Sequence, residues 1–161
     1  MDVKKFKVAL DRVNELHKQR EYDSAIKLVQ ELIACSPYSV DLLVKYAKLI
    51  QLLDKDSSEF SPLEAAPRIL KLAHLISPDS IKPCIELGYF EYAVNDSPFQ
   101  AMQYFQMAQE KAESSLKEVL IGQIKCYIDI NNISQASEVL ERAKLFFPDD
   151  IDIKMIEAEL E

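Results

Sequence analysis

The sequence predicts an all-α protein built from stacked helical hairpins, and three observations support this prediction. A pattern of small and apolar residues recurs in four segments, at spacings of 41, 35 and 35 residues, beginning at Ala25, Ala66, Ala101 and Ala136. The 161 residues include only two glycines, and such scarcity favours helices with short turns over a loop-rich β fold. Prolines end three of the four segments, as expected where helices stop: Pro37, Pro78 and Pro148.

The recurring pattern is small–x3–large–x2–small–x4–Pro, which places the first three residues on one face of a helix. Two segments match it fully, with Ala66, Leu70, Ala73 and Pro78, and with Ala136, Leu140, Ala143 and Pro148. The first segment has Leu32 at the second small position. The third has Ala101, Phe105 and Ala108, but Glu113 stands where the proline is expected.

This pattern resembles the second helix of the tetratricopeptide repeat (TPR), a hairpin of two helices repeated about every 34 residues. The resemblance covers nearly the whole chain, as repeats 6–39, 40–80, 81–114 and 115–148 followed by a capping helix at 149–161. It implies a single domain folded as a right-handed α-α superhelix, a TPR-like solenoid of four helical hairpins plus a C-terminal capping helix. The pattern of the first helices is weaker, with Leu87-Gly88 and, 34 residues later, Ile121-Gly122.

Residues that start or stop helices, such as proline and serine, give the bounds of the expected helices in chain order. The first hairpin has helices at 2–18 and from Tyr22 to about Cys35. The second has a helix over 42–53, capped by Ser39 or Asp41, and another that starts at Ser61-Pro62. Between them, residues 54–61 hold the extra length that makes the first spacing 41 residues.

The third hairpin, 82–112, turns at Asn95-Asp96-Ser97-Pro98, and its small residues let two backbones approach with Phe105 filling the space between them. A new repeat is expected at Ser115, at the same register as the third, with Gly122 equivalent to Gly88. The capping helix is expected to turn its apolar residues inward and its acidic residues outward; the inward set is Ile151, Met155, Ile156 and Leu160.

The composition limits the classes of partner. The net charge of −8 disfavours nucleic acid and anionic membranes, since both are bound mainly through basic side chains. No apolar run is long enough to span a membrane, and the first residues do not read as a secretory signal. The three cysteines lack metal-ligand spacing, so reduced thiols and a cytoplasmic location are expected; they are Cys35, Cys84 and Cys126.

No catalytic, metal or cofactor pattern is present. The two histidines, His17 and His74, lie in different repeats, and no His or Cys pair has zinc spacing. The segment from Asp54 begins like a calcium loop but lacks the turn glycine and the final acidic ligand. The sequence therefore predicts a protein that is not an enzyme and needs no cofactor.

The resemblance implies that ligands bind on the concave side, which the first helices line. The candidate binding residues that follow are Lys7, Asn14, His17, Lys18, Lys48, Gln51, Lys82, Tyr89, Tyr92, Gln123 and Tyr127. With Leu10, Asp41, Val44 and Leu52 beside them, this groove has four lysines and one aspartate, a formal charge of +3 in a chain of −8. It is expected to bind an extended or helical protein segment that carries acidic and apolar residues.

The predicted function is a protein–protein interaction scaffold or adaptor. A family subclass grips C-terminal carboxylates with a Lys-Asn-Asn-Lys-Arg set, but the matching positions hold Leu10, Asn14, Lys45, Lys82 and Glu86, so that type of binding is not expected. Three alternatives stay open. One is a small acidic dedicated chaperone, similar in size and class to type III secretion translocator chaperones. Another is an inhibitor or immunity-type partner that uses its acidic face. The third is a self-associating structural scaffold, such as a homodimer.

Overall fold

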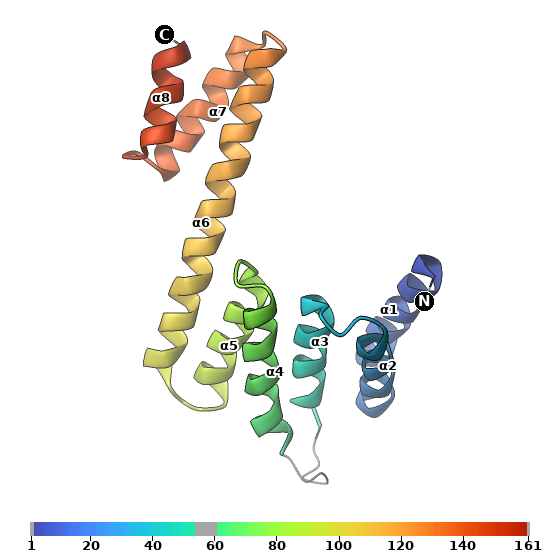
Figure 1. The fold of residues 1–161 in the computed structure, drawn as a ribbon. Helices are drawn as coiled ribbons and strands as arrows, with labels where there is room; N and C mark the ends of the chain where they lie inside the picture. Colours follow the sequence, from blue (N-terminus) through green and yellow to red (C-terminus); the bar gives the residue numbers. More distant parts are fainter. Residues whose placement is uncertain (1, 54–60, 161) are drawn as a thin grey trace. The chain divides into compact units, whose positions relative to one another are not determined.

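The computed structural model describes residues 2–53 and 61–160, and this part of the chain is helical without strands (Figure 1). Its helices are α1 (Val3–Lys18), α2 (Tyr22–Cys35), α3 (Val40–Ile50), α4 (Pro62–Ile76), α5 (Ile81–Ala93), α6 (Pro98–Asp129), α7 (Ile133–Phe146) and α8 (Ile151–Leu160). Residues 54–60 of the insertion expected at 54–61, where the rejected calcium-loop pattern begins, lie outside the described residues. Within the described ranges, no helix has both the length and the apolar character that a membrane crossing requires.

The chain forms two compact units, Met1–Gln109 and Glu110–Glu161. In the first unit each helix from α1 to α4 packs on the next helix along the chain, and α3 also contacts α5 (Figure 1). The second unit has its own apolar core, in which Leu120 and Ile124 of α6 lie with residues of α7 and α8. Hairpins of consecutive helices confirm the predicted fold class.

The small residues of the repeated pattern are buried where each second helix meets its hairpin partner. The first alanine of every segment is at most 2% exposed, and Leu32, which replaces a small residue in the first segment, is 1% exposed. An alanine at this position keeps two helix backbones close, because a larger side chain would hold them apart. The prediction that these residues face inward is therefore confirmed.

Gly88 and Phe105 show the close approach expected in the third hairpin. A Cβ atom added to Gly88 would lie 2.7 Å from Cε1 of the Phe105 ring. The same ring packs edge-on against Tyr89, with ring centroids 5.2 Å apart. Phe105 thus fills the space that the missing side chain of Gly88 leaves, as the sequence predicted.

Helix α3 ends three residues earlier than the sequence predicts. It stops at Ile50, and the chain then tightens through hydrogen bonds from Leu52 N to Leu49 O and from Leu53 N to Ile50 O. These are bonds across three residues, which often close the last turn of a helix when no further α-helical partner is available.

Helix α6 is continuous over 32 residues, so the helix break expected near Ser115 is absent. The predicted boundary between the third and fourth repeats therefore falls inside one helix. The sequence supplies the reason: Glu113 stands at the position where proline ends the other three segments, and glutamate is a good helix former. Ser115 is accommodated in the helix by donating its hydroxyl to the carbonyl of Lys111.

Gly122 does not occupy the position equivalent to Gly88. An added Cβ at Gly122 meets nothing within 4 Å, whereas Gly88 is in tight contact. The turn between α5 and α6 has four residues, whereas the turn between α6 and α7 has three. Gly88 lies thirteen positions before Ala101, so the equivalent residue of the last hairpin lies only twelve positions before Ala136. That residue is Ile124, which is fully buried like Val13 of α1. The predicted equivalence of the two glycines is wrong.

The inward face predicted for the capping helix α8 is confirmed only in part, since Ile156 and the partly buried Leu160 pack in the core of the second unit. Ile153 and Ile156 are buried, whereas Ile151 and Met155 are exposed. The phase of the helix is set at its start, where Asp150 Oδ1 accepts hydrogen bonds from the backbone N–H groups of Asp152 and Ile153. This cap makes Ile151 the first helical residue and leaves positions 153 and 156 on the core side.

The same Asp150 carboxylate also holds α8 to α6, because Lys117 Nζ lies 2.9 Å from Asp150 Oδ2. The hydrogen bond from Lys117 holds the pKa of Asp150 below its ordinary value, and backbone N–H donors act in the same direction. A carboxyl whose pKa falls on folding stabilises the folded state above its unfolded pKa, and this stabilisation is lost as the pH falls through the folded value.

We therefore expect Asp150→Asn, which keeps the cap oxygen but removes the charge, to lower the melting temperature of the second unit at pH 7 and to have a smaller effect at pH 3, below the unfolded pKa of the carboxyl. The measurement is helix content followed by circular dichroism during heating at both pH values. Asp149→Asn, at an almost fully exposed neighbouring carboxylate, is the control. An equal effect of Asp150→Asn at both pH values would contradict the role of its charge.

Candidate protein-binding groove

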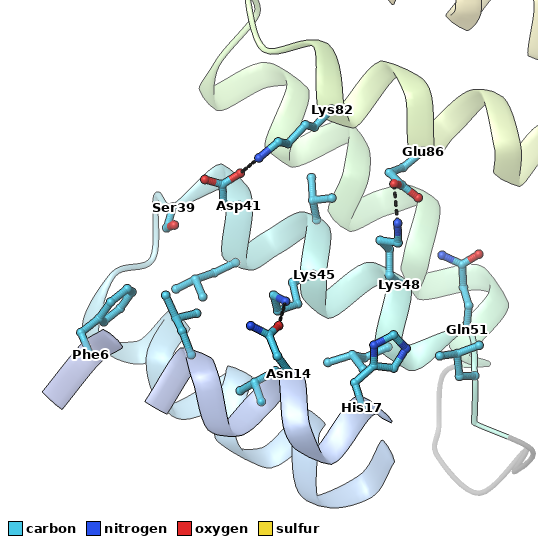
Figure 2. A pocket seen from close by; sticks show the side chains of 16 residues that line it. Phe6, Asn14, His17, Ser39, Asp41, Lys45, Lys48, Gln51, Lys82 and Glu86 are labelled. Carbon is cyan, nitrogen blue, oxygen red and sulfur yellow. Dashed lines mark hydrogen bonds and ion pairs between the residues drawn. The ribbon is translucent and has the colours of Figure 1, made fainter. Parts of the chain in front are cut away.

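A groove of about 920 Å³ lies in the first unit, between α1, α3 and α5 (Figure 2). This volume suits the side chains of a bound peptide segment rather than a single ion. Helix α1 supplies one wall, α3 supplies the floor and most of the polar groups, and α5 supplies the far edge. The lining residues are Phe6, Leu10, Val13, Asn14, His17, Ser39, Asp41, Leu42, Val44, Lys45, Lys48, Leu49, Gln51, Leu52, Lys82 and Glu86.

Seven of these residues are aliphatic or aromatic and give the groove an apolar surface. They lie on α1 and along α3, including the residues just after its end: Phe6, Leu10, Val13, Leu42, Val44, Leu49 and Leu52. Leu42 and Leu49 are almost completely buried, whereas Leu52 is 40% exposed. Exposed apolar surface in a concave site gains free energy when a partner covers it.

Two ion pairs cross the groove between α3 and α5 (Figure 2). Lys48 Nζ lies 2.7 Å from Glu86 Oε1, and Lys82 Nζ lies 2.7 Å from Asp41 Oδ1. In the first pair α3 supplies the lysine and α5 the acid, whereas in the second pair α3 supplies the acid and α5 the lysine. These exposed pairs join neighbouring hairpins on the concave side and neutralise two of the groove's three lysines.

Lys45 is placed differently from the other two lysines. Its Nζ donates a hydrogen bond of 2.6 Å to Asn14 Oδ1 across the groove between α3 and α1, and no carboxylate pairs with it among the described residues (Figure 2). Burial lowers the pKa of the Lys45 ammonium and the nearby charge of Lys48 lowers it further, whereas the charge of Asp41 raises it. An incoming anion would favour the charged form of this half-buried ammonium.

The structure brings five of the predicted binding residues into this groove. They are Asn14, His17, Lys48, Gln51 and Lys82. Gln51 turns its amide onto the α3 backbone and donates to Ala47 O, so its free amide oxygen is the part available to a ligand.

The other six predicted binding residues lie outside the groove lining. Lys7 and Lys18 are exposed on α1, and Tyr89 and Tyr92 are exposed further along α5. Gln123 and Tyr127 belong to the second unit, where they line a separate shallow hollow.

Sequence reasoning missed several groove residues, of which Lys45 and Glu86 matter most for charge. With them, the lining has three lysines and two carboxylates, a formal charge of +1 instead of the expected +3. Lys45 lies four residues after Asp41 and three residues before Lys48, so it shares a helix face with both. The spacing from these two predicted groove residues would therefore have identified it. Phe6 and Val13 lie four residues before and three residues after Leu10, so the helical spacing from Leu10 would have found them.

In the part of the chain that the structure describes, no cluster of His, Cys, Asp and Glu side chains could hold a metal ion. His17 lies near Tyr22 with ring centroids 6.0 Å apart, and His74 Nδ1 lies 3.6 Å from the buried Cys84 Sγ. The groove thus combines apolar surface with ammonium groups, and this combination suits a protein segment that carries apolar and acidic side chains.

No protein-family model matches the chain. Over 115 residues it is 26% identical to an uncharacterized 18.1 kDa protein in the carS 3′ region of Myxococcus xanthus, and the match covers 71% of this chain and 68% of that protein.

Two solved structures are similar to the chain, each at 16% sequence identity. TTC0263, a thermophilic TPR protein of Thermus thermophilus, matches with a TM-score of 0.54 over 92% of this chain and 77% of that one. The MamA protein matches with a TM-score of 0.51, over 96% and 80%. The fold is therefore a TPR-like helical solenoid.

Proposed function

We propose that this protein is a non-catalytic interaction scaffold that binds a segment of another protein in the groove between α1, α3 and α5. The observation that carries the proposal is the combination of apolar surface and lysine side chains within one concave site of about 920 Å³. TPR-like folds support a protein partner. The proposal keeps the cytoplasmic location and the absence of nucleic-acid binding that the sequence predicts.

The groove favours a segment with apolar side chains and at least one carboxylate. Phe6, Leu10 and Leu52 offer the surface for the apolar side chains. Lys45 offers the ammonium for the carboxylate, because its hydrogen-bond partner is the neutral amide of Asn14. A carboxylate that reaches Lys45 forms a charge-assisted hydrogen bond, which is stronger than the amide contact it replaces.

The proposal is tested by selecting binders from a library of random peptides and measuring their dissociation constants with fluorescence anisotropy. We expect the selected peptides to combine Asp or Glu with apolar residues. Lys48→Glu/Lys82→Glu should weaken their binding about tenfold or more, since it places new carboxylates beside Glu86 and Asp41. Lys45→Glu should have a similar effect.

The matched control is Lys27→Glu/Lys71→Glu, which makes the same change of charge on exposed positions of α2 and α4 outside the groove. If the groove variant and the control bind the selected peptides with equal affinity and equal salt dependence, the groove is not the binding site. Selection of peptides without acidic residues would contradict the proposed chemistry of the partner.

A further inference from the structure

Two exposed tyrosines lie on α5, on the helix that forms the far edge of the groove. Tyr89 is 58% exposed and Tyr92 is 62% exposed. Their spacing of three residues places both on one face of the helix, with their Cβ atoms about 5–6 Å apart. Two rings on one exposed helix face offer a continuous aromatic surface. These two residues are here called the tyrosine pair.

The register of the helices shows which way the tyrosine pair faces. The first residues of α3 and α5 are 41 positions apart, and each helix follows a serine. The same offset separates the acid and the lysine of one ion pair across the groove. Tyr89 is therefore equivalent to Lys48, which lines the groove. Tyr92 is equivalent to Gln51, which also lines it.

Helix α1 has the same arrangement as α3. Its fully buried Val13 takes the place of the fully buried Ala47, so the next residue, Asn14, is equivalent to Lys48. Asn14 and His17, at the two positions that correspond to the tyrosine pair, both line the groove. The tyrosine pair thus continues the concave face from α1 and α3 onto α5.

The ring of Tyr89 is held in place by its own hairpin. Phe105 packs edge-on against it, with ring centroids 5.2 Å apart and ring planes at 77°. Phe105 can lie there because Gly88 has no side chain, since an added Cβ would be 2.7 Å from the Phe105 ring. A ring that is already ordered loses little conformational entropy when a partner covers it.

The two acids of α5 are already engaged. Glu86 is paired with Lys48 at 2.7 Å. Glu91 is 6% exposed and accepts a 2.8 Å hydrogen bond from the side chain of Asn95. A cation stacked on the tyrosine pair would have to compete for these carboxylates, so the surface favours an uncharged partner group.

The position of the tyrosine pair relative to Lys45 limits the backbone of a bound segment. The ion pair between Lys48 and Glu86 places these residues at a similar level of α3 and α5 (Figure 2). Lys45 lies three residues before Lys48, and Tyr89 lies three residues after Glu86. This axial rise, with the usual spacing of packed helices, separates the two side chains by about 13 Å. An extended segment covers that distance in about four residues.

We propose that the tyrosine pair binds a proline of the partner segment, about four residues from the acidic residue that reaches Lys45. This assignment rests on the proposed function of the groove and names a second feature of its partner. A proline ring is flat and uncharged, and proline-containing segments dock on aromatic surfaces in an extended conformation. Proline also fixes its own φ and disfavours helix at the preceding residue, so the segment loses little entropy on binding.

Peptides selected from the random library with the unmodified protein are the probe. We expect proline to be enriched about four residues from the acidic residue. Replacement of that proline by alanine should weaken binding to the unmodified protein about tenfold in fluorescence anisotropy. The same peptide change should have little effect on Tyr89→Ala/Tyr92→Ala, because the rings that contact proline are gone. An equal effect on both proteins, or enrichment of arginine instead of proline, would overturn the assignment.

The matched control is Tyr38→Ala/Phe99→Ala, which removes two exposed rings outside the groove lining. It should keep the full effect of the proline replacement. The lysine variant Lys48→Glu/Lys82→Glu separates this assignment from the proposed function. If that variant weakens binding while the tyrosine variant keeps the full proline effect, the groove remains the binding site and the role of the tyrosine pair is overturned.

Tyr92→Ala alone separates binding from folding. Tyr92 is 62% exposed, and the ring contacts of the described residues do not include it, so this variant should give the circular dichroism spectrum of the unmodified protein. It should still reduce the effect of the proline replacement by about half or more. A folded Tyr92→Ala variant that keeps the full proline effect would contradict a binding surface made by both rings.

Discussion

Replacement of Leu70 by alanine is expected to lower the free energy of unfolding of the first unit by about 2–5 kcal/mol. Leu70 is fully buried in α4, between the small residues Ala66 and Ala73 of the repeated pattern. Its removal leaves a cavity that the rigid alanine positions on either side cannot close, because they already hold the helix at close range.

Leu75→Ala is the matched control for this change. Leu75 lies on the same helix but is 75% exposed, so its truncation should alter the free energy of unfolding by no more than about 0.5 kcal/mol. Urea denaturation followed by circular dichroism, with hydrogen exchange of α4 peptides to assign the transition to the first unit, gives both values. Equal effects of the two substitutions would contradict the burial of Leu70.

The second large effect is expected from Gly88→Val, which should destabilise the first unit by about 1–3 kcal/mol. The new Cβ would lie 2.7 Å from the Phe105 ring, and the ring is itself held against Tyr89. Valine adds two methyl groups in this narrow space, so the strain outweighs the gain in helix propensity over glycine.

A double-mutant cycle with Phe105→Ala isolates this clash. In the Phe105→Ala background the ring is gone, and Gly88→Val should then be neutral or stabilising. Chemical denaturation of the four proteins provides the coupling energy. A destabilisation by Gly88→Val of the same size in both backgrounds would show that the backbone, rather than the Phe105 ring, requires glycine at this position.

The starts and the buried faces of the second helices were predictable from the sequence because their rule is local. A position where two backbones meet accepts only a small residue, and Ala25, Ala66, Ala101 and Ala136 therefore mark the hairpins directly. The helix break near Ser115 was predicted from the repeat length alone. Glu113 already indicated that the usual stop signal is absent, and a helix without a stop signal continues.

The register of the fourth first helix was mispredicted for a geometric reason. Equating Gly88 with Gly122 assumes equal turn lengths, but the turn before α7 is one residue shorter than the turn before α6. A one-residue difference rotates the helix position by about 100° and moves a residue from a buried to an exposed face. Turn lengths depend on backbone dihedrals, such as the positive φ of Asn131, which the repeat pattern does not encode.

The groove was predictable in location but not in charge. The first helices of the repeat pattern were expected to line the concave side, and this predicted Asn14, Lys48 and Lys82 as groove residues. The pairing of Lys48 with Glu86 joins residues 38 positions apart, and it depends on how closely α3 and α5 pack. Such pairs across hairpins cannot be derived from the spacing within either helix.

The two ion pairs across the groove make Asp41 and Glu86 internal counterions of Lys82 and Lys48. A carboxylate that bound either lysine would displace one of these acids into water, so the electrostatic gain would be the difference between two similar exposed pairs. Charge exchange of this kind contributes little net affinity. Discrimination among acidic ligands therefore falls to the shape of the apolar surface and to the single ammonium of Lys45.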